Sequence, residues 1–255
     1  AAPDFGPAQI LNARILAGQR DFDASLALVE KVLSREPSLY EAWHLKGEIL
    51  ALAKNDITGA ETAFKKALEV ERSYVPAHLA LIGIRLRARD IPGAKIQADA
   101  LRALMPKHPQ TIFVDAQVAF TERDLPKARD LVQVLLKAAP NHTGVLQLAG
   151  AVEGQAGSLV LAETYFSKAL QIAPELPLAR RNLAQTYLRL GQPAKALETL
   201  QPMLTGSVAD SDAHALAGEA KLRLGDAVAA TAHFAQAVKI RPDNLRVRTA
   251  MALTH

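Results

Sequence analysis

The segment AETYFSKALQIAP, residues 162–174, contains an alanine, a phenylalanine four positions later and a proline twelve positions after the alanine. The alanine returns every 34 residues as Ala60, Ala94, Ala128, Ala162, Ala196 and Ala230. The position four residues further on is always apolar, at Phe64, Ala98, Val132, Phe166, Leu200 and Phe234. Residues four apart lie on one face of a helix, and a proline stops a helix. A pattern with this fixed interval is typical of a helical repeat array.

A second small residue precedes the alanine by twelve positions in most units, at Ala116, Gly150, Ala184 and Gly218. Gly47 lies one position early, which predicts one extra residue in the second unit, and Ile82 departs from the pattern. Between the two columns, cap residues such as Arg89-Asp90 and Gly225-Asp226 are expected to end one helix and begin the next. Each unit is therefore predicted to contain two helices joined by a short turn.

The interval predicts units that begin near residues 6, 40, 75, 109, 143, 177 and 211, with a partial eighth unit near residue 245. The longest loop is expected from Thr205 to Ser211. We find no linker long enough to divide the array, so residues 1–255 are interpreted as a single solenoid. Because the chain starts without a methionine and stops inside the expected eighth helix, we interpret it as a fragment of a longer chain.

Composition excludes several classes of function. The absence of cysteine rules out disulfides, thiolate metal sites and a cysteine nucleophile. A formal net charge of +4 without a run of Lys and Arg is much weaker than the basic stripe of a nucleic-acid-binding protein, so no nucleic-acid partner is predicted. No uncharged apolar stretch reaches the length of a membrane span, so a membrane is expected only through an anchor outside this fragment.

The reactive side chains form no recognisable catalytic arrangement. The seven histidines include no His-x-x-x-His pair, and a catalytic zinc ion typically needs three converging protein ligands. Neither a glycine-rich phosphate loop nor a paired nucleophile and base occurs. The sequence therefore predicts a protein that is not an enzyme, with no catalytic residues, no metal and no cofactor.

These residues resemble tetratricopeptide (TPR) repeats over the whole chain. The clearest units contain Trp43, Gly47, Ala60, Phe64 and Ala67, and Gly218, Gly225, Ala230, Phe234, Ala237 and Pro242. The resemblance implies an all-α, right-handed superhelical solenoid of antiparallel helix pairs, with about seven repeats and a partial eighth. It also implies that the first helix of each pair lines a concave groove.

A narrower resemblance concerns residues 146–153, 178–181, 185–197 and 200–204. These stretches look like the TPR-repeat lipoproteins of bacterial PEP-CTERM/exosortase systems, which accompany exopolysaccharide genes. This resemblance implies a bacterial cell-envelope protein on the periplasmic side, whose lipid-anchored parent carries a cysteine that this fragment lacks. The sequence by itself does not establish the compartment.

The first helices supply the candidate partner-binding groove. Its predicted residues are His44, Glu48, Leu79, Phe113, Gln117, Gln147, Arg181, Gln185, Arg189, Glu219 and Arg223. They depart at every unit from the Lys and Asn clamp of chaperone-binding TPR domains, so that clamp is not predicted. The arginines could pair with carboxylates of an extended or helical peptide. The alternatives are a simply solvated face and, less favoured because few exposed aromatics are available, a glycan-binding groove.

We therefore expect a non-enzymatic protein-protein interaction scaffold, whose groove binds a partner polypeptide in an envelope system for exopolysaccharide or PEP-CTERM protein sorting. The alternative is a regulatory or substrate-recruiting TPR arm of an enzyme whose catalytic domain lies outside this fragment. End-to-end self-association of the array is a further possible contact.

Overall fold

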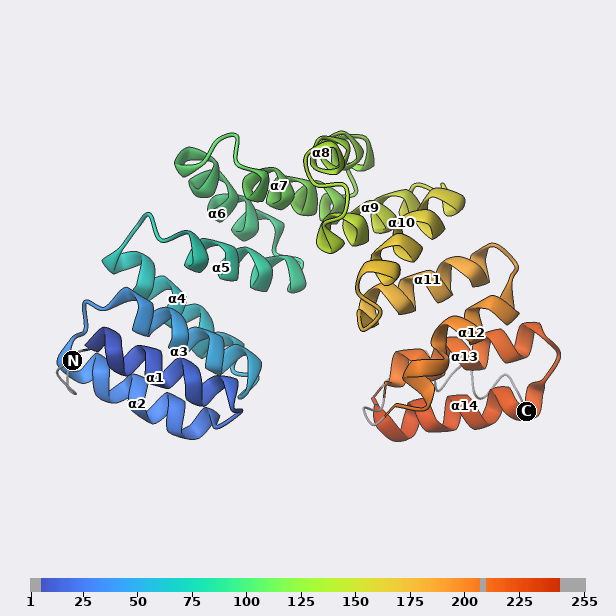
Figure 1. The fold of residues 1–255 in the computed structure, drawn as a ribbon, viewed down its shortest axis with the longest axis horizontal. Coiled ribbons are helices and arrows are strands. Elements are labelled where there is room, and N and C mark those ends of the chain that lie inside the picture. Colours follow the sequence, from blue (N-terminus) through green and yellow to red (C-terminus); the bar gives the residue numbers. More distant parts are fainter. Residues whose placement is uncertain (1–5, 207–209, 244–255) are drawn as a thin grey trace. The chain divides into compact units, whose positions relative to one another are not determined.

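The described part of the protein folds into α-helices. A computed structural model describes residues 6–206 and 210–243, and within these ranges it contains fourteen α-helices and no strand (Figure 1). The helices are α1 (Gly6–Gly18), α2 (Phe22–Arg35), α3 (Tyr40–Leu52), α4 (Ile57–Val70), α5 (Val75–Arg87), α6 (Ile91–Leu104), α7 (Pro109–Glu122), α8 (Leu125–Ala138), α9 (Thr143–Gln155), α10 (Leu159–Ile172), α11 (Pro177–Arg189), α12 (Pro193–Leu204), α13 (Ser211–Arg223) and α14 (Ala227–Ile240). The predicted all-α repeat fold is confirmed.

The odd-numbered helices are the first helices of seven pairs. They begin at residues 6, 40, 75, 109, 143, 177 and 211. These are the residues near which the repeat units are predicted to begin. The second helix starts sixteen residues after the first in every pair except α3 and α4, where the interval is seventeen, so the extra residue lies in the turn between them. The expected eighth unit lies outside the described residues.

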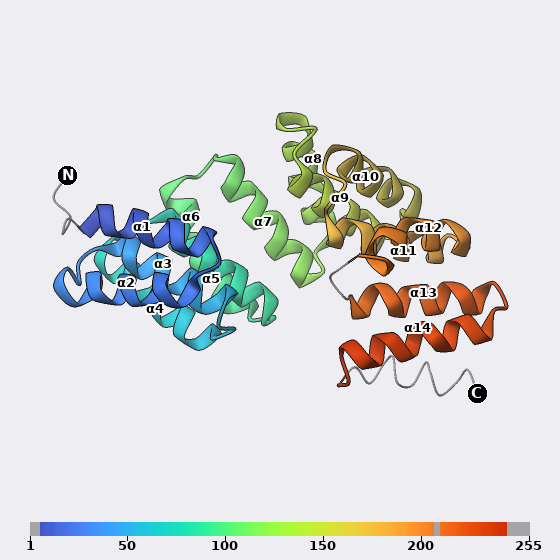
Figure 2. The ribbon, with the colours of Figure 1, turned by 60° about the horizontal axis from the view of Figure 1, so that its bottom comes forward.

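Contacts between Cα atoms divide the chain into two compact units, residues 1–124 and 125–255. The first contains α1 to α7 and the second contains α8 to α14. Within each unit, successive helices pack against one another as antiparallel neighbours (Figures 1 and 2). A single continuous solenoid over residues 1–255 stays a prediction, and each unit is described by itself.

The turns before α2, α4, α6 and α14 have an aspartate cap, whereas the predicted caps Ser158 and Gln192 make no side-chain cap hydrogen bond. A residue with positive φ ends the first helix of each pair, at Arg20, Asn55, Arg89, Arg123, Gly157, Gly191 and Gly225. Asp56 then accepts a hydrogen bond from the Gly59 N–H at 2.8 Å, and Asp90 accepts one from the Gly93 N–H at 3.0 Å. Such caps satisfy backbone donors that the first turn of a helix leaves without partners. In the six pairs that lie within one compact unit, the second helix packs against the first.

In the pairs that lie within one compact unit, the two helices meet where a small residue faces a large one. In three pairs the small residue is a glycine and the large one a buried phenylalanine: Gly47 with Phe64, Gly150 with Phe166, and Gly218 with Phe234. A Cβ atom built on any of these glycines would lie 2.6 to 2.7 Å from a ring carbon of its phenylalanine. The ring therefore fills the space that a side chain on the first helix would need.

At Ile82 the sizes are reversed, with the large residue on the first helix and the small residue on the second. Ile82 is buried on α5, and the facing column position on α6 is the small residue Ala98, which is also buried. Ser25, which replaces the column alanine in the first pair, is fully buried and donates a hydrogen bond from Oγ to the Ala13 carbonyl at 2.7 Å. Both exceptions thus keep the helices closely packed, because a change on one helix is compensated locally.

Replacing Gly150 with alanine should destabilise the protein. The added methyl group would overlap the buried Phe166 ring, and overpacking of this kind typically costs about 1–3 kcal/mol. The free energy of unfolding from urea denaturation measures the effect. The matched control is Gly83→Ala, since nothing lies within 4 Å of that position and alanine is favoured over glycine inside a helix by about 0.5–1 kcal/mol.

Adding Phe166→Leu to Gly150→Ala should recover part of the loss, because the pair would then match Ala184 and Leu200, which are both fully buried. Equal stability of Gly150→Ala and Gly83→Ala would contradict this matching of small with large residues.

Candidate functional site

The predicted partner-binding residues all lie on first helices. His44 and Glu48 are on α3, Leu79 on α5, Phe113 and Gln117 on α7, Gln147 on α9, Arg181, Gln185 and Arg189 on α11, and Glu219 and Arg223 on α13. In the first unit α1 contacts α3 and α5 contacts α7, and in the second unit α11 contacts both α9 and α13. We call the surface formed by these neighbouring helices within a unit the first-helix face.

His44 is part of the packing in the first unit. Its ring is 5.3 Å from the Phe64 ring and 5.4 Å from the Tyr74 ring, and the residue is 7% exposed. Burial lowers the pKa of His44, although the Glu48 carboxylate, 3.6 Å from Nδ1, acts in the opposite direction. His44 therefore presents little surface to a partner, and Glu48 is the more exposed of the two.

The other predicted residues of the first unit are partly buried. Leu79 packs against the core cluster that contains Ile82 and Val114. Phe113 and Gln117 lie one helical turn apart on α7, and each is half-buried. The first-helix face of this unit is thus apolar at Leu79 and Phe113, with one amide at Gln117.

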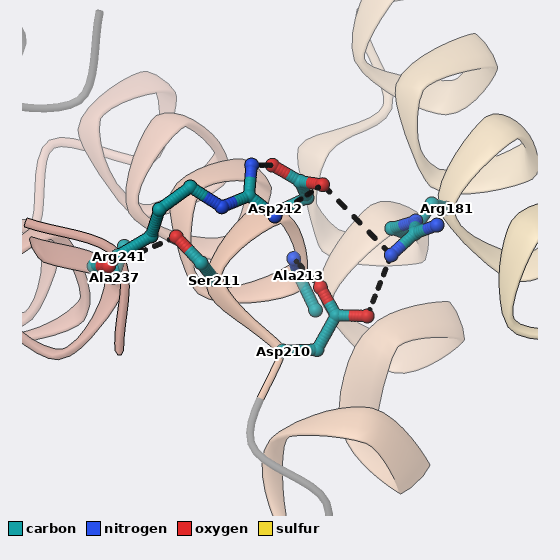
Figure 3. Close-up of polar contacts among 7 residues, drawn as sticks. All are labelled: Arg181, Asp210, Ser211, Asp212, Ala213, Ala237 and Arg241. Carbon is teal, nitrogen blue, oxygen red and sulfur yellow. Dashed lines mark hydrogen bonds and ion pairs between the residues drawn. The ribbon is translucent and has the colours of Figure 1, made fainter. Parts of the chain in front are cut away.

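Arg181 is held by two aspartates at the start of α13 (Figure 3). Its Nη1 atom is 2.7 Å from Asp210 Oδ2 and 3.9 Å from Asp212 Oδ2. Asp210 also caps α13 by accepting a hydrogen bond from the Ala213 N–H at 2.9 Å, and Arg241 pairs with Asp212 at 3.2 Å. The guanidinium group therefore joins α11 to α13 inside the chain.

Arg189 and Arg223 have equivalent roles in two successive helix pairs. Each donates a hydrogen bond to a backbone carbonyl 35 residues earlier, Arg189 to Gly154 at 2.6 Å and Arg223 to Leu188. Both carbonyls belong to the last turn of the preceding first helix. Each also accepts the N–H of the glycine three residues later, from Gly157 at 3.3 Å and from Gly191 at 3.1 Å. Arg223 also pairs with Glu219 at 2.6 Å. The predicted cationic residues of the groove thus stabilise neighbouring helix ends.

The glutamines of the second unit differ from these arginines. Gln185 is exposed on α11, and Gln147 is half-buried on the adjacent α9. A side-chain amide can donate and accept hydrogen bonds without bringing a charge to the surface. Gln147 and Gln185 thus give this face uncharged hydrogen-bond donors and acceptors.

Sequence reasoning missed a polar contact that recurs within the helix pairs. The fourth residue of a first helix reaches the second helix nineteen residues later: His78 contacts Gln97 at 2.8 Å, and Arg180 donates to the Thr199 carbonyl at 3.1 Å. The same side chains contact the carbonyl six residues before them, as His78 does with Arg72 at 2.9 Å. Because different residue types make this contact, no single letter recurs in the sequence to reveal it.

The seventh pair makes the equivalent contact with two histidines. His214 Nδ1 and His233 Nδ1 are 3.2 Å apart. Burial lowers the pKa of both rings; Asp210 opposes the shift at His214, and Asp226 opposes it at His233, where His214 and Lys221 lower the pKa further. Both imidazoles are therefore favoured in the neutral form.

This pair predicts a loss of stability in acid. Because the folded-state pKa lies below the unfolded value of about 6.5, the unfolded chain takes up more protons as the pH falls below that value, and the contribution of the pair to stability is lost. His233→Gln, which copies the contact of His78 with Gln97, should lose less stability between about pH 7.5 and pH 5.5, as measured by urea denaturation. An equal loss in both proteins would contradict this role of the pair.

Neither a metal site nor a membrane span is found among the described residues. Within residues 6–206 and 210–243, no group of three or more His, Asp or Glu side chains is arranged to hold a metal ion. Over the same ranges, no helix combines the length and the apolar character needed to span a bilayer.

Stacked pairs of short helices with a 34-residue interval define a helical-repeat protein. Two family models described as tetratricopeptide repeat match residues 10–76 and residues 155–222. Together these stretches cover more than half of the chain. The chain belongs to the tetratricopeptide repeat family. A search of curated proteins finds no match.

Solved structures share this fold at low sequence identity. A tetratricopeptide repeat protein from Parabacteroides merdae aligns over 98% of both chains, with a TM-score of 0.76 and 15% identity. PilF of Pseudomonas aeruginosa aligns over 86% of this chain and 99% of its own, with a TM-score of 0.62 and 17% identity. Human IFIT1, in a dimer with m7Gppp-AAAA, aligns over 97% of this chain and 61% of its own, with a TM-score of 0.79 and 18% identity. These similarities show a common fold.

Proposed function

We propose that this protein is a non-enzymatic scaffold that binds a partner polypeptide on its first-helix face. The tetratricopeptide repeat fold is consistent with protein-protein interaction, and proteins with this fold generally bind protein or peptide partners. The observation that carries the proposal is the placement of Gln147 and Gln185 on two adjacent first helices, with Gln185 exposed and Gln147 half-buried.

The chemistry of the face favours a polar, extended segment. The amides of Gln147 and Gln185 can bond the backbone N–H and C=O groups that an extended peptide exposes. Arg181 and Arg223 already have carboxylate partners inside the chain, so an acidic partner would have to displace Asp210 or Glu219. We therefore favour recognition of peptide backbone over the carboxylate pairing expected from the arginines alone.

We propose the cellular context from the resemblance of residues 146–153, 178–181, 185–197 and 200–204. In this proposal the protein lies on the periplasmic side of a bacterial envelope, within a lipid-anchored parent that serves exopolysaccharide production or PEP-CTERM protein sorting. One continuous solenoid over residues 1–255 belongs to the same proposal. Fractionation of source cells tests the location: recovery of the parent protein in the cytosol would contradict the envelope assignment.

A photo-reactive amino acid at position 185 should crosslink a polypeptide in living source cells, because that exposed position lies on the proposed binding face. The matched control places the same group at Gln236, an exposed glutamine on the second helix α14 of the same unit. Mass spectrometry of the adduct identifies the partner and the crosslinked peptide.

The proposal expects one discrete adduct from position 185 and none of that mass from position 236. Adding Gln147→Ala should reduce the yield, since it removes the adjacent amide. Identical adducts from positions 185 and 236, or no polypeptide adduct from position 185, would overturn binding on this face.

A further inference from the structure

A pocket of about 220 Å³ opens between the starts of α1 and α3 in the first unit. Pro7, Ile10, Leu11 and Arg14 line it from α1, and Leu39 and Glu41 line it from the beginning of α3. These two first helices lie side by side in both views of the chain (Figures 1 and 2). Drug-sized ligands typically occupy about 300–1,000 Å³, so this volume is better suited to a single large side chain.

The next junction along the unit shows what fills such a space. Between α3 and α5, the rings of Tyr40 and Tyr74 lie 4.7 Å apart, and the His44 ring packs edge-on against Tyr74 at 5.4 Å. Tyr40 is the first residue of α3, His44 lies four positions later, and Tyr74 directly precedes α5. Three rings thus meet where these two first helices begin.

The junction of α1 with α3 has smaller side chains at the same three places. Gly6 is the first residue of α1, Ile10 lies four positions later, and Leu39 directly precedes α3. The α1 junction therefore has no ring at these three places, and the Glu36 carboxylate lies against Gly6. The neighbouring junction thus indicates that an aromatic ring is the group that fits the pocket.

The polar residues that line the pocket favour a ligand that carries a hydrogen-bond donor. The Tyr40 phenol interacts with the Glu41 carboxylate, yet Glu41 Oε2 is buried and has no hydrogen-bond partner among the described residues. A buried carboxylate oxygen without a partner is costly, and the last torsion of a glutamate side chain rotates easily, so an oxygen can meet a donor brought into the pocket. Arg14, which interacts with the Tyr74 phenol, supplies a cation on the opposite wall. A tyrosine would bring both the ring and the missing donor.

The surface beside the pocket is also open for a partner. Leu11 is 61% exposed and Ile15 is 52% exposed on α1. The residues equivalent to Ile15 in the other six first helices are all buried, at Ile49, Ile84, Val118, Val152, Thr186 and Ala220. Apolar side chains next to the pocket can cover the residues that flank the inserted ring.

From these observations we infer that the pocket between α1 and α3 anchors a tyrosine side chain of the partner polypeptide, with the phenol donating to Glu41. The inference rests on the proposed scaffold function, because it adds an anchor at one end of a first-helix face. Arg14 and Ile10 occupy the same helix positions as Glu48 and His44, so the pocket continues the predicted groove into the first helix pair.

The test uses the full chain with methyl-labelled isoleucine and leucine, and the peptide amides Ac-Gly-Tyr-Gly, Ac-Gly-Phe-Gly and Ac-Gly-Ala-Gly as probes. The tyrosine probe should shift the methyl resonances of Ile10, Leu11 and Leu39 in a saturable way by about 10 mM. The phenylalanine probe should bind about three- to tenfold more weakly because it lacks the donor, and the alanine probe should not bind.

Two variants separate the ring from the donor. Glu41→Ala should bring the tyrosine probe to the affinity of the phenylalanine probe. Leu11→Ala removes one wall and should weaken both probes, whereas Leu178→Ala, at a 53% exposed leucine on α11, should leave them unchanged. Methyl spectra of each variant report whether it is folded.

Non-saturable shifts with the tyrosine probe at about 10 mM, or equal shifts with the alanine probe, would overturn the pocket assignment. Equal affinity of the tyrosine and phenylalanine probes would overturn the role of Glu41. Neither result affects crosslinking at position 185, so failure of the pocket and failure of the scaffold function can be told apart.

Discussion

The close crossing between the two helices of a pair, in the six pairs that lie within one compact unit, is the constraint on which the rest of the structure depends. The fully buried alanine column lets the second helix approach, and the volumes of the facing residues compensate, as Gly150 does with Phe166 and Ile82 with Ala98. A close-packed interior tolerates neither an empty space nor an extra methyl group, so each pair has one well-defined arrangement. Stacking similar pairs then buries a continuous core along each unit.

This packing decides which residues are left for recognition. Each first helix packs one face against its second helix and exposes another. Side chains on the exposed face also form hydrogen bonds with the ends of neighbouring helices. Arg189 and Arg223 bond the last carbonyls of preceding first helices, and Arg181 is bound by Asp210. These three arginines are thus paired within the chain, so the proposed binding relies on amides such as Gln185 and on the pocket at α1.

The sequence predicted on which helices the candidate site residues lie, but not which of them are buried. Helical periodicity places His44, Gln147 and Arg181 at matching first-helix positions, and the structure has them on those helices. Periodicity does not reveal that His44 would be covered by Phe64 and Tyr74, because those residues lie outside its own helix. The predicted groove does not include Arg14, although this residue occupies in the first helix pair the position that Glu48 has in the second.

The sequence by itself determined the repeat length, the starts of the helices and the crossing residues, because these depend on local propensity and on a spacing that recurs within a few turns of helix. It also determined the family. Only the tertiary structure decided which polar groups pair and where the space remains, as with Arg181 and Asp210 or the pocket beside Glu41. Those outcomes depend on distances between side chains of different helices, which become defined when the pairs stack.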